Sequence, residues 1–262
     1  MIQNLFFQET VAEKLQHTVP LSVFDSVSST NDLLREAAAL GAPEGTVIAA
    51  RQQTAGRGRQ GRSFFSPPGT GLYLSMLLRP LGSPEQILSL TPMAAVAAAQ
   101  AIERCTGQHA EIKWVNDLIL HGRKICGILA ESSYSECRKE PDFVILGIGI
   151  NLLTPAGGFP PELQAIAGAV YPEGADAQDA FCSLCAALTD ALLTQYAMLP
   201  ERAYLAEYKS RLCVLGRRIT VCENGAEIPA EALAVDDDLR LLVRYPDGSE
   251  QWRSTGEIRI RI

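Results

Sequence analysis

Short β-prone runs alternate with longer helical runs over the first 215 residues of this 262-residue chain, and this order most constrains the fold. The runs typical of strands cover residues 47–50, 72–78, 110–114, 118–120, 124–130 and 143–148. The runs typical of helices cover residues 32–40, 84–105, 177–199 and 203–212. Residues 28–31 and Ser83 can cap the first two helices, and Gly41 suits the end of the first. Strands and helices mixed along one chain predict an α/β (α+β) domain in which helices cover a sheet.

After about residue 215 the chain contains only short β-prone runs. They cover residues 219–222, 232–235, 239–245 and 257–260. Asn224-Gly225 and Asp247-Gly248 lie between them, and both dipeptides are typical of tight hairpin turns. We therefore expect two domains, residues 1–214 as the mixed α/β part and residues 215–262 as a small β-barrel.

The overall charge is acidic, with 23 Lys and Arg against 30 Asp and Glu and a net charge of −7. A chain of this charge does not suit a protein that coats nucleic acid or an anionic membrane with its whole surface. Residues 51–62 are the exception, because they carry four arginines and no acidic residue. Any anion-binding site is therefore expected to be local.

The seven cysteines are odd in number and irregularly spaced, which predicts free thiols in a reducing compartment. Cys182 and Cys185 are spaced like half of a zinc site, but the second pair is missing and an apolar helical run surrounds them. We expect both to pack in the core. Residues 1–4 lack the basic segment of a signal peptide, and the apolar stretch 87–102 is too short and too polar to span a bilayer. These features predict a cytoplasmic protein with no membrane partner.

Residues 53–62 contain G-x-G-x-x-G at Gly56, Gly58 and Gly61. A dinucleotide-binding motif needs a helix directly after its glycines, and residues 66–69, Ser-Pro-Pro-Gly, do not start one cleanly. What remains is a flexible loop whose arginines could grip phosphate or carboxylate oxygens. The motif favours a small, multiply charged anion as ligand, and the alternative is a solvated basic loop.

Three further segments could contribute catalytic or ligand-binding residues. Asn116-Asp117 follows a predicted strand and could hold Mg²⁺, a ribose or an adenine, or form an ordinary turn. Lys124 opens an apolar run and could stabilise charge on an acyl or phosphoryl oxygen, or simply face solvent in a hairpin. Gly147 and Gly149 alternate in a predicted strand, which indicates that a ligand or another backbone approaches closely.

An enzyme nucleophile is not supported by the sequence. No G-x-S-x-G pattern occurs, and His17, His109 and His121 lie near no Ser or Cys motif. His121 precedes a glycine and is expected in a turn.

The order of these segments closely resembles the biotin–protein ligases, also called biotin–[acetyl-CoA-carboxylase] ligases. The resemblance is carried by residues 29–31 (Ser-Thr-Asn), 53–59 (Gln-Thr-Ala-Gly-Arg-Gly-Arg), 113–117 (Lys-Trp-Val-Asn-Asp), 123–127 (Arg-Lys-Ile-Cys-Gly) and 147–151 (Gly-Ile-Gly-Ile-Asn). It implies a mixed-sheet catalytic domain of the biotin/lipoate ligase type and a small SH3-like C-terminal barrel. It also implies a two-step reaction. Biotin and ATP, with Mg²⁺, form biotinyl-5′-AMP, and the biotinyl group then passes to a lysine of a carrier such as that of acetyl-CoA carboxylase.

The resemblance assigns roles to individual residues. The positions that match catalytic ones are Lys124, Arg57 and Asp117. Those that match the substrate site are Ser29, Thr30, Asn31, Gln53, Arg57, Gly58, Arg59, Lys124, Gly127, Gly147 and Gly149. Those that match the nucleotide site are Arg57, Arg59, Arg62, Trp114, Asn116, Asn151 and Arg261. No metal ligands are assigned.

Some features depart from the larger members of this family. Their DNA-binding domain precedes the catalytic part, and only 28 residues precede Ser29 here, so we expect a monofunctional ligase with no DNA partner. Val115 stands where many relatives have proline, and Ala234 and Leu239 stand where glycines are usual. The resemblance allows a homodimer. A lipoate or octanoate ligase and a non-catalytic biotin-binding protein remain the alternatives.

Overall fold

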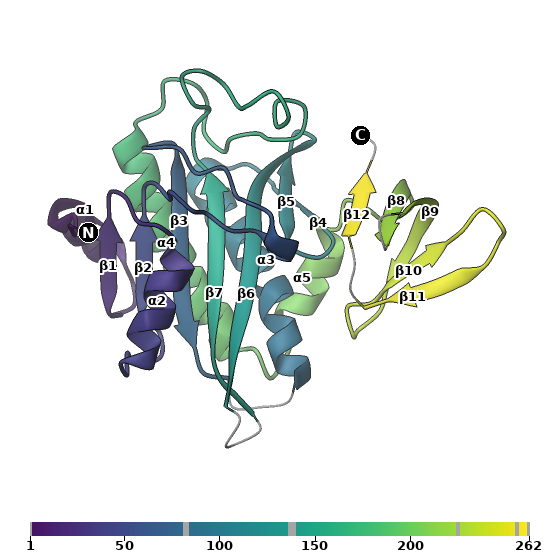
Figure 1. The fold of residues 1–262 in the computed structure, drawn as a ribbon, viewed down its shortest axis with the longest axis horizontal. Coiled ribbons are helices and arrows are strands. Elements are labelled where there is room, and N and C mark those ends of the chain that lie inside the picture. The colour runs from purple at the N-terminus through teal and green to yellow at the C-terminus, as the bar shows by residue number, and fades with distance from the viewer. Residues whose placement is uncertain (1, 81–83, 136–139, 224–225, 255–256, 261–262) are drawn as a thin grey trace.

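The computed structural model describes residues 2–80, 84–135, 140–223, 226–254 and 257–260. Its larger part is built on a seven-stranded sheet with the order β1-β2-β3-β7-β6-β5-β4 (Figure 1). The strands are β1 (Leu21–Phe24), β2 (Val47–Ala50), β3 (Gly71–Leu78), β4 (Glu111–Lys113), β5 (Asp117–Leu120), β6 (Arg123–Ser135) and β7 (Glu140–Asn151). The pair β1–β2 is parallel and the other pairs are antiparallel, so the sheet is mixed, as the sequence predicts.

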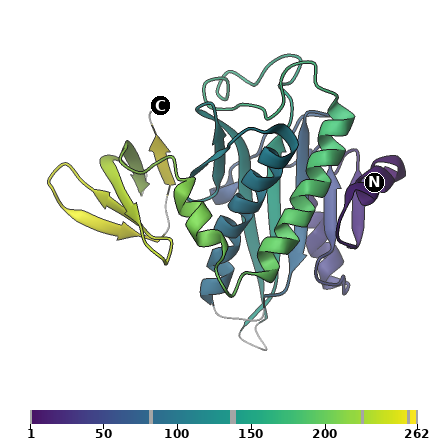
Figure 2. The same cartoon turned by 180° about the vertical axis from the view of Figure 1, so that it is seen from behind.

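Helices cover both faces of this sheet. The long helices α3 (Pro84–Thr106) and α4 (Ala177–Ala197) lie on one face together with α5 (Tyr204–Ser210), as Figure 2 shows. Helix α2 (Thr30–Ala39) lies on the other face, against β2, β3 and β7, and the loop between β2 and β3 crosses the same face (Figure 1). Helix α1 (Leu5–Lys14) packs beside α4. The face with α2 and the loop is therefore only partly covered by regular structure.

Helix α2 forms where its sequence signals lie. The Ser29 hydroxyl accepts a hydrogen bond from the Asp32 amide and caps the helix, and Gly41 takes a φ of +92° just beyond its end. Its N-terminal residues Thr30 and Asn31 are buried against the sheet. The cap thus fixes the predicted Ser-Thr-Asn segment at the middle of the sheet.

The predicted core assignments are confirmed. Cys182 and Cys185 are fully buried on α4, and all six cysteines among the described residues are free. His121 and Gly122 both have positive φ and form the tight turn between β5 and β6. No helix within the described ranges is long and apolar enough to cross a membrane.

The C-terminal part is a five-stranded antiparallel sheet with the order β11-β10-β9-β8-β12. Its strands are β8 (Arg218–Glu223), β9 (Ala226–Val235), β10 (Leu241–Arg244), β11 (Glu250–Arg253) and β12 (Glu257–Ile260). This sheet fits the predicted SH3-like domain, and Gly248 makes the β10–β11 hairpin turn with a φ of +84°. The second predicted hairpin dipeptide, at 224–225, lies outside the described residues. The boundary at residue 215 stays a prediction.

Candidate active site

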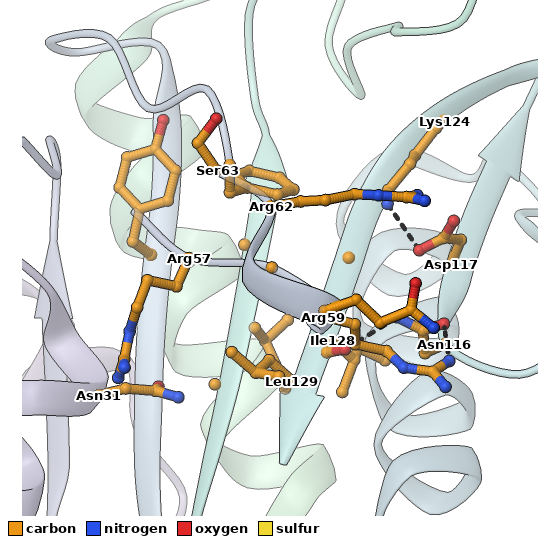
Figure 3. Close-up of a pocket in the computed structure, with 18 of the residues that line it drawn as sticks. Asn31, Arg57, Arg59, Arg62, Ser63, Asn116, Asp117, Lys124, Ile128 and Leu129 are labelled. Atoms are coloured by element: carbon orange, nitrogen blue, oxygen red, sulfur yellow. Dashed lines mark hydrogen bonds and ion pairs between the residues drawn. The ribbon is translucent and has the colours of Figure 1, made fainter. Parts of the chain in front are cut away.

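A pocket lies on the sheet face that carries α2, beneath the loop between β2 and β3 (Figure 3). The predicted site residues that line it are Ser29, Thr30, Asn31, Gln53, Arg57, Gly58, Arg59, Arg62, Trp114, Asn116, Asp117, Lys124, Gly127, Gly147 and Gly149. They come from the cap and first turn of α2, the loop, the turn between β4 and β5, and strands β5, β6 and β7. Ile258 of β12 also lines the pocket, so the C-terminal part borders it.

One end of the pocket is lined by hydroxyl and amide side chains. The Thr30 amide and hydroxyl both donate to Gln53 Oε1, at 2.8 and 3.1 Å. Ser75 Oγ of β3 lies 2.8 Å from Thr30 Oγ1 and 2.6 Å from Asn31 Oδ1. Because Ser75 is fully buried, these hydroxyl and amide groups are held in fixed orientations. The sequence prediction did not include Ser75, which reads as an ordinary strand residue.

The floor of the pocket is formed by glycines on two paired strands, with Gly127 of β6 opposite Gly149 of β7. The Phe64 ring lies against both. A Cβ built at Gly149 would be 2.8 Å from this ring, and one at Gly127 would be 3.1 Å from it. A Cβ at Gly147 would be 2.2 Å from Asn31 Oδ1. The sequence predicts that a ligand or another backbone approaches Gly147 and Gly149, whereas the groups that lie against them in this structure are side chains.

The opposite end of the pocket is charged. Lys124 Nζ forms an ion pair with Asp117 Oδ1 at 2.6 Å. Arg59 Nη1 donates to Asn116 Oδ1 at 2.9 Å, and Asn116 Nδ2 donates to the Ile128 carbonyl. The Arg62 side chain extends toward Lys124 and Asp117 (Figure 3). The structure thus gathers the loop arginines, the Asn-Asp turn and the hairpin lysine, segments that lie apart in the sequence.

Arg57 points away from this charged end, toward Asn31 (Figure 3). Its Nη2 pairs with Asp32 Oδ1 at 2.6 Å and with Glu131 Oε2 at 3.0 Å. The sequence prediction included neither carboxylate. Glu131 had a usable signal, because the two-residue period of a strand places it on the same face as Gly127.

Three predicted nucleotide contacts have different outcomes, because one is absent from the pocket lining, one belongs to it and one is not described. Asn151 does not line the pocket, because its side chain donates to the Gly168 carbonyl and ties β7 to the following loop. Trp114 lines the pocket, but its indole Nε1 donates to the Leu239 carbonyl of the C-terminal part at 2.9 Å. Arg261 lies outside the described residues.

The pocket offers cationic and neutral polar groups and one carboxylate, Asp117, but no activated nucleophile. Burial raises the pKa of the Cys126 thiol on β6, so this thiol stays protonated at neutral pH. Burial likewise raises the pKa of the pocket phenol Tyr73. Among the residues that the structure describes, no three His, Cys, Asp or Glu side chains gather as a metal site. Such a pocket can bind and polarise an anionic substrate without forming a covalent enzyme intermediate.

Two family models match the chain. Residues 23–151 match the biotin/lipoate A/B protein ligase family, and residues 214–261 match the biotin protein ligase C-terminal domain. The biotin–[acetyl-CoA-carboxylase] ligase of Paracoccus denitrificans is 35% identical in an alignment of 218 positions that covers 78% of this chain and 85% of that protein. The corresponding protein of Mycobacterium tuberculosis is 32% identical over 84% of this chain and 82% of its own length.

Longer relatives match over a smaller share. The bifunctional ligase/repressor BirA of Bacillus spizizenii is 44% identical over 143 residues, and the matched segment spans 43% of that protein. Among solved structures, the biotin protein ligase of Aquifex aeolicus in complex with biotin and ATP superposes with a TM-score of 0.74. That match has 25% identity and covers 92% of this chain and 98% of the other. The fold, both matched segments and the near full-length relatives lead to one conclusion: the chain belongs to the biotin/lipoate A/B protein ligase family.

Proposed function

We propose that this protein activates biotin with ATP as biotinyl-5′-AMP and transfers the biotinyl group to a lysine of the carrier protein of acetyl-CoA carboxylase. The single observation that carries the proposal is the division of the pocket into a neutral polar end and a cationic end on one glycine floor. Biotin is divided in the same way, with a neutral ureido ring at one end and a carboxylate at the other. The names of the near full-length relatives support the same substrate and carrier.

The neutral end suits the ureido ring. Ser29, Thr30 and Gln53 offer hydroxyl and amide groups that can both donate and accept, as the ring requires. Because Gly127, Gly147 and Gly149 carry no side chains, the Phe64 ring and Asn31 lie close against the sheet and line the pocket beside them. On this assignment Asn31 borders the ureido ring and holds the polar network in place.

The cationic end suits the first chemical step. A biotin carboxylate oxygen attacks the α-phosphorus of ATP, the bond to the bridging oxygen breaks, and pyrophosphate leaves with the electron pair. Both reactants are anions, so Lys124, Arg59 and Arg62 would reduce their repulsion and stabilise the charge that builds on the phosphoryl oxygens. Trp114 and Asn116 stand beside these residues as proposed nucleotide contacts.

The second step forms an amide bond. The neutral amine of the carrier lysine attacks the acyl carbonyl of the adenylate, AMP leaves, and the amine loses a proton. Asp117 is our proposed acceptor of that proton, because its carboxylate faces the pocket. The loop with Arg57, Gly58 and Arg59 would keep water away from the mixed anhydride until the carrier arrives.

Mg²⁺ would complete the proposed set of reactants, because bound with ATP it would neutralise charge on the triphosphate. Magnesium in such sites keeps several waters and uses one or two carboxylates together with substrate phosphates. Asp117 fits that pattern as a single carboxylate at the cationic end.

We also infer that the reaction takes place in the cytoplasm. A homodimer is tested by sedimentation of the purified chain with and without biotin and ATP.

Pyrophosphate release by the purified protein tests the proposal. We expect release from ATP with biotin, and none with lipoate or without an acid. Release with lipoate instead would keep the chemistry and overturn the substrate. No release with either acid would contradict the enzymatic proposal, and direct titration with biotin would then test a binding protein.

A further inference from the structure

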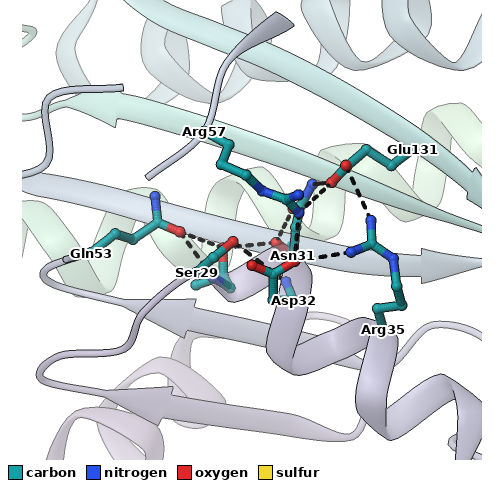
Figure 4. A network of polar contacts seen from close by, with 9 residues as sticks. Ser29, Asn31, Asp32, Arg35, Gln53, Arg57 and Glu131 are labelled. Carbon is teal, nitrogen blue, oxygen red and sulfur yellow. Dashed lines mark hydrogen bonds and ion pairs between the residues drawn. The ribbon is translucent and has the colours of Figure 1, made fainter. Parts of the chain in front are cut away.

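The Arg57 side chain occupies a different place from the other cations of the loop. Arg59 and Arg62 extend toward Asn116, Asp117 and Lys124, whereas Arg57 enters a cluster of ionic contacts on the other side of the loop (Figures 3 and 4). Its Nη2 contacts one carboxylate on α2, Asp32, and one on β6, Glu131. The loop is therefore connected to both a helix and a central strand through a single side chain.

Both carboxylates are held by partners other than Arg57. Arg35 of α2 pairs with Asp32 Oδ1 at 2.9 Å and with Glu131 Oε1 at 3.1 Å. Asn31 Nδ2 donates to Glu131 Oε2 at 2.7 Å, and Asn31 is itself fixed by Ser75. Two positive and two negative side chains make the cluster neutral, so no charge is left over for a ligand anion. The two carboxylates thus form a preorganised binding site for one guanidinium group.

The base of the loop is already fixed by its backbone. The Thr54 and Ala55 amides donate to the Val27 and Ser28 carbonyls, and the Phe64 amide donates to the Gly56 carbonyl. Between these points the loop pairs with itself, Arg57 opposite Ser63 and the Gly58 amide on the Arg62 carbonyl, and this paired segment carries the arginines that face the pocket. An anchor at Arg57 therefore ties the paired segment to α2 and β6.

We infer that Asp32 and Glu131 are positioning residues, which hold the loop over the pocket by binding Arg57 and so retain the adenylate. This inference rests on the proposed function and deepens it. Arg57 acts through the position of the loop, and the ligand phosphate is contacted by the other cations. The opposite arrangement would have Arg57 leave the carboxylates and bind the phosphate, so that the carboxylates compete with the ligand.

The two arrangements predict opposite effects of Glu131→Gln, which keeps the side-chain size and removes the charge. We expect labelled biotinyl-5′-AMP, preloaded and chased with unlabelled adenylate, to leave this variant up to about fivefold faster, as for the loss of one partly exposed ion pair. Asp32→Asn should act in the same direction. If the carboxylates compete with the ligand, release from both variants becomes slower, and that result, like an unchanged rate, overturns the inference.

A double-mutant cycle separates an anchor from a ligand contact. Arg57→Ala should also release the adenylate faster, so that nearby lysines are labelled indiscriminately. Because Arg57 acts through the carboxylates, Arg57→Ala with Glu131→Gln should release it no faster than Arg57→Ala alone. Additive effects would contradict the inference. Glu250→Gln is the matched control, because it breaks a half-exposed ion pair with Arg244 on the β10–β11 hairpin, away from the pocket.

A second measurement needs no activity. Hydrogen exchange of the empty protein should show faster exchange of the amides of residues 57–63 in Glu131→Gln than in the unaltered protein, and no change in Glu250→Gln. Faster exchange in a protein that releases no pyrophosphate would retain the anchor and reject the proposed function. Normal pyrophosphate release with unchanged exchange and unchanged adenylate retention would reject the anchor alone.

Discussion

At the scale of single residues, the site depends on glycines in the sheet, which carry no side chain. Gly147 lies directly beneath Asn31, the residue that connects Ser75 to Glu131. Gly149 and Gly127 leave the space that the Phe64 ring occupies. Any larger residue at these positions would move a neighbour that belongs to the proposed binding network.

Gly147→Ala tests this dependence. The new methyl group would come within 2.2 Å of Asn31 Oδ1, so Asn31 must move. We expect the free energy of unfolding to fall by about 1–3 kcal/mol, as in other overpacked cores, and the KM for biotin to rise. Urea unfolding and steady-state kinetics measure the two effects. Gly157→Ala is the control, because no atom lies within 4 Å of its built Cβ, and equal effects at both positions would contradict the argument.

Lys124→Ala tests the cationic end. The Lys124 side chain is 37% exposed, so its removal should leave the fold intact, as circular dichroism would show. We expect adenylation to slow by roughly a hundred- to a thousand-fold, because a charge aimed at the reacting phosphoryl group is lost. Biotin-dependent pyrophosphate release measures the rate. An unchanged rate would remove Lys124 from the proposed chemistry.

At the scale of elements, the pocket depends on how α5 joins the edge of the sheet. Arg211, which follows α5, is 8% exposed and donates to Glu103 of α3, Glu207 of α5 and the Ala110 carbonyl before β4. Its own carbonyl accepts from the Ile112 amide of β4, and the Cys213 amide donates to the Ile112 carbonyl. This one side chain therefore connects two helices to the edge strand that leads into the Asn-Asp turn.

Arg211→Met should lower the free energy of unfolding by about 1–3 kcal/mol at neutral pH. The methionine fills much of the space, but the hydrogen bonds to the two glutamates and the carbonyl are lost. Chemical denaturation measures the difference. A change within experimental error would show that water satisfies Glu103, Glu207 and the Ala110 carbonyl as well as Arg211 does.

The same arginine gives stability a pH dependence. Its hydrogen bond holds the pKa of the Glu103 carboxyl below the ordinary value of 4.5. A lowered folded-state pKa contributes stability above pH 4.5 and loses it as pH falls through the lowered value. Unfolding measured at neutral pH and at about pH 3 should therefore show a larger loss for the unaltered protein than for Arg211→Met. Equal losses would show that Glu103 does not contribute.

At the scale of the whole molecule, the two sheets share one contiguous hydrophobic core, to which Ala232, Leu241 and Val243 of the C-terminal part belong. The Trp114 indole reaches across to the Leu239 carbonyl. Leu239 is 8% exposed and has a φ of +63°, a conformation that usually favours glycine. A strained backbone conformation therefore occurs at the point where the two parts of the molecule meet.

Leu239→Gly tests whether backbone strain or side-chain burial at this position has the larger effect on stability. Glycine would relieve about 1–2 kcal/mol of left-handed strain, but removing a buried leucine side chain costs about 2–5 kcal/mol. We expect a net loss of stability and a lower Tm. His121→Gly is the control, because His121 has a φ of +50° in an exposed turn, where relief of strain should leave Tm equal or higher. A higher Tm for Leu239→Gly would show that strain exceeds burial there.

The sequence by itself determined the elements whose signals are local. The cap and terminal glycine of α2, the helical runs of α3 and α4 and the turn at Asp247-Gly248 each report on a few neighbouring residues, and the structure has these features within a few positions of the expected bounds. The family motifs supplied most of the pocket lining. Helix α1, strands β1 and β11 and the short 3-10 helix at Arg59–Gly61 were not predicted. Of these, β11 is exposed along most of its length and therefore has no apolar alternation to detect.

Only the tertiary structure decided which distant groups meet. Asp32 and Glu131 are 99 positions apart, and they reach one guanidinium because α2 packs across β7 beside β6. Phe64 lies on Gly127 and Gly149 because the loop folds back over the sheet, and Trp114 meets Leu239 because the second sheet docks on the first. A local sequence pattern reports only on the periodicity and capping of one segment. The contacts between segments follow from strand order and packing, which depend on the whole chain at once.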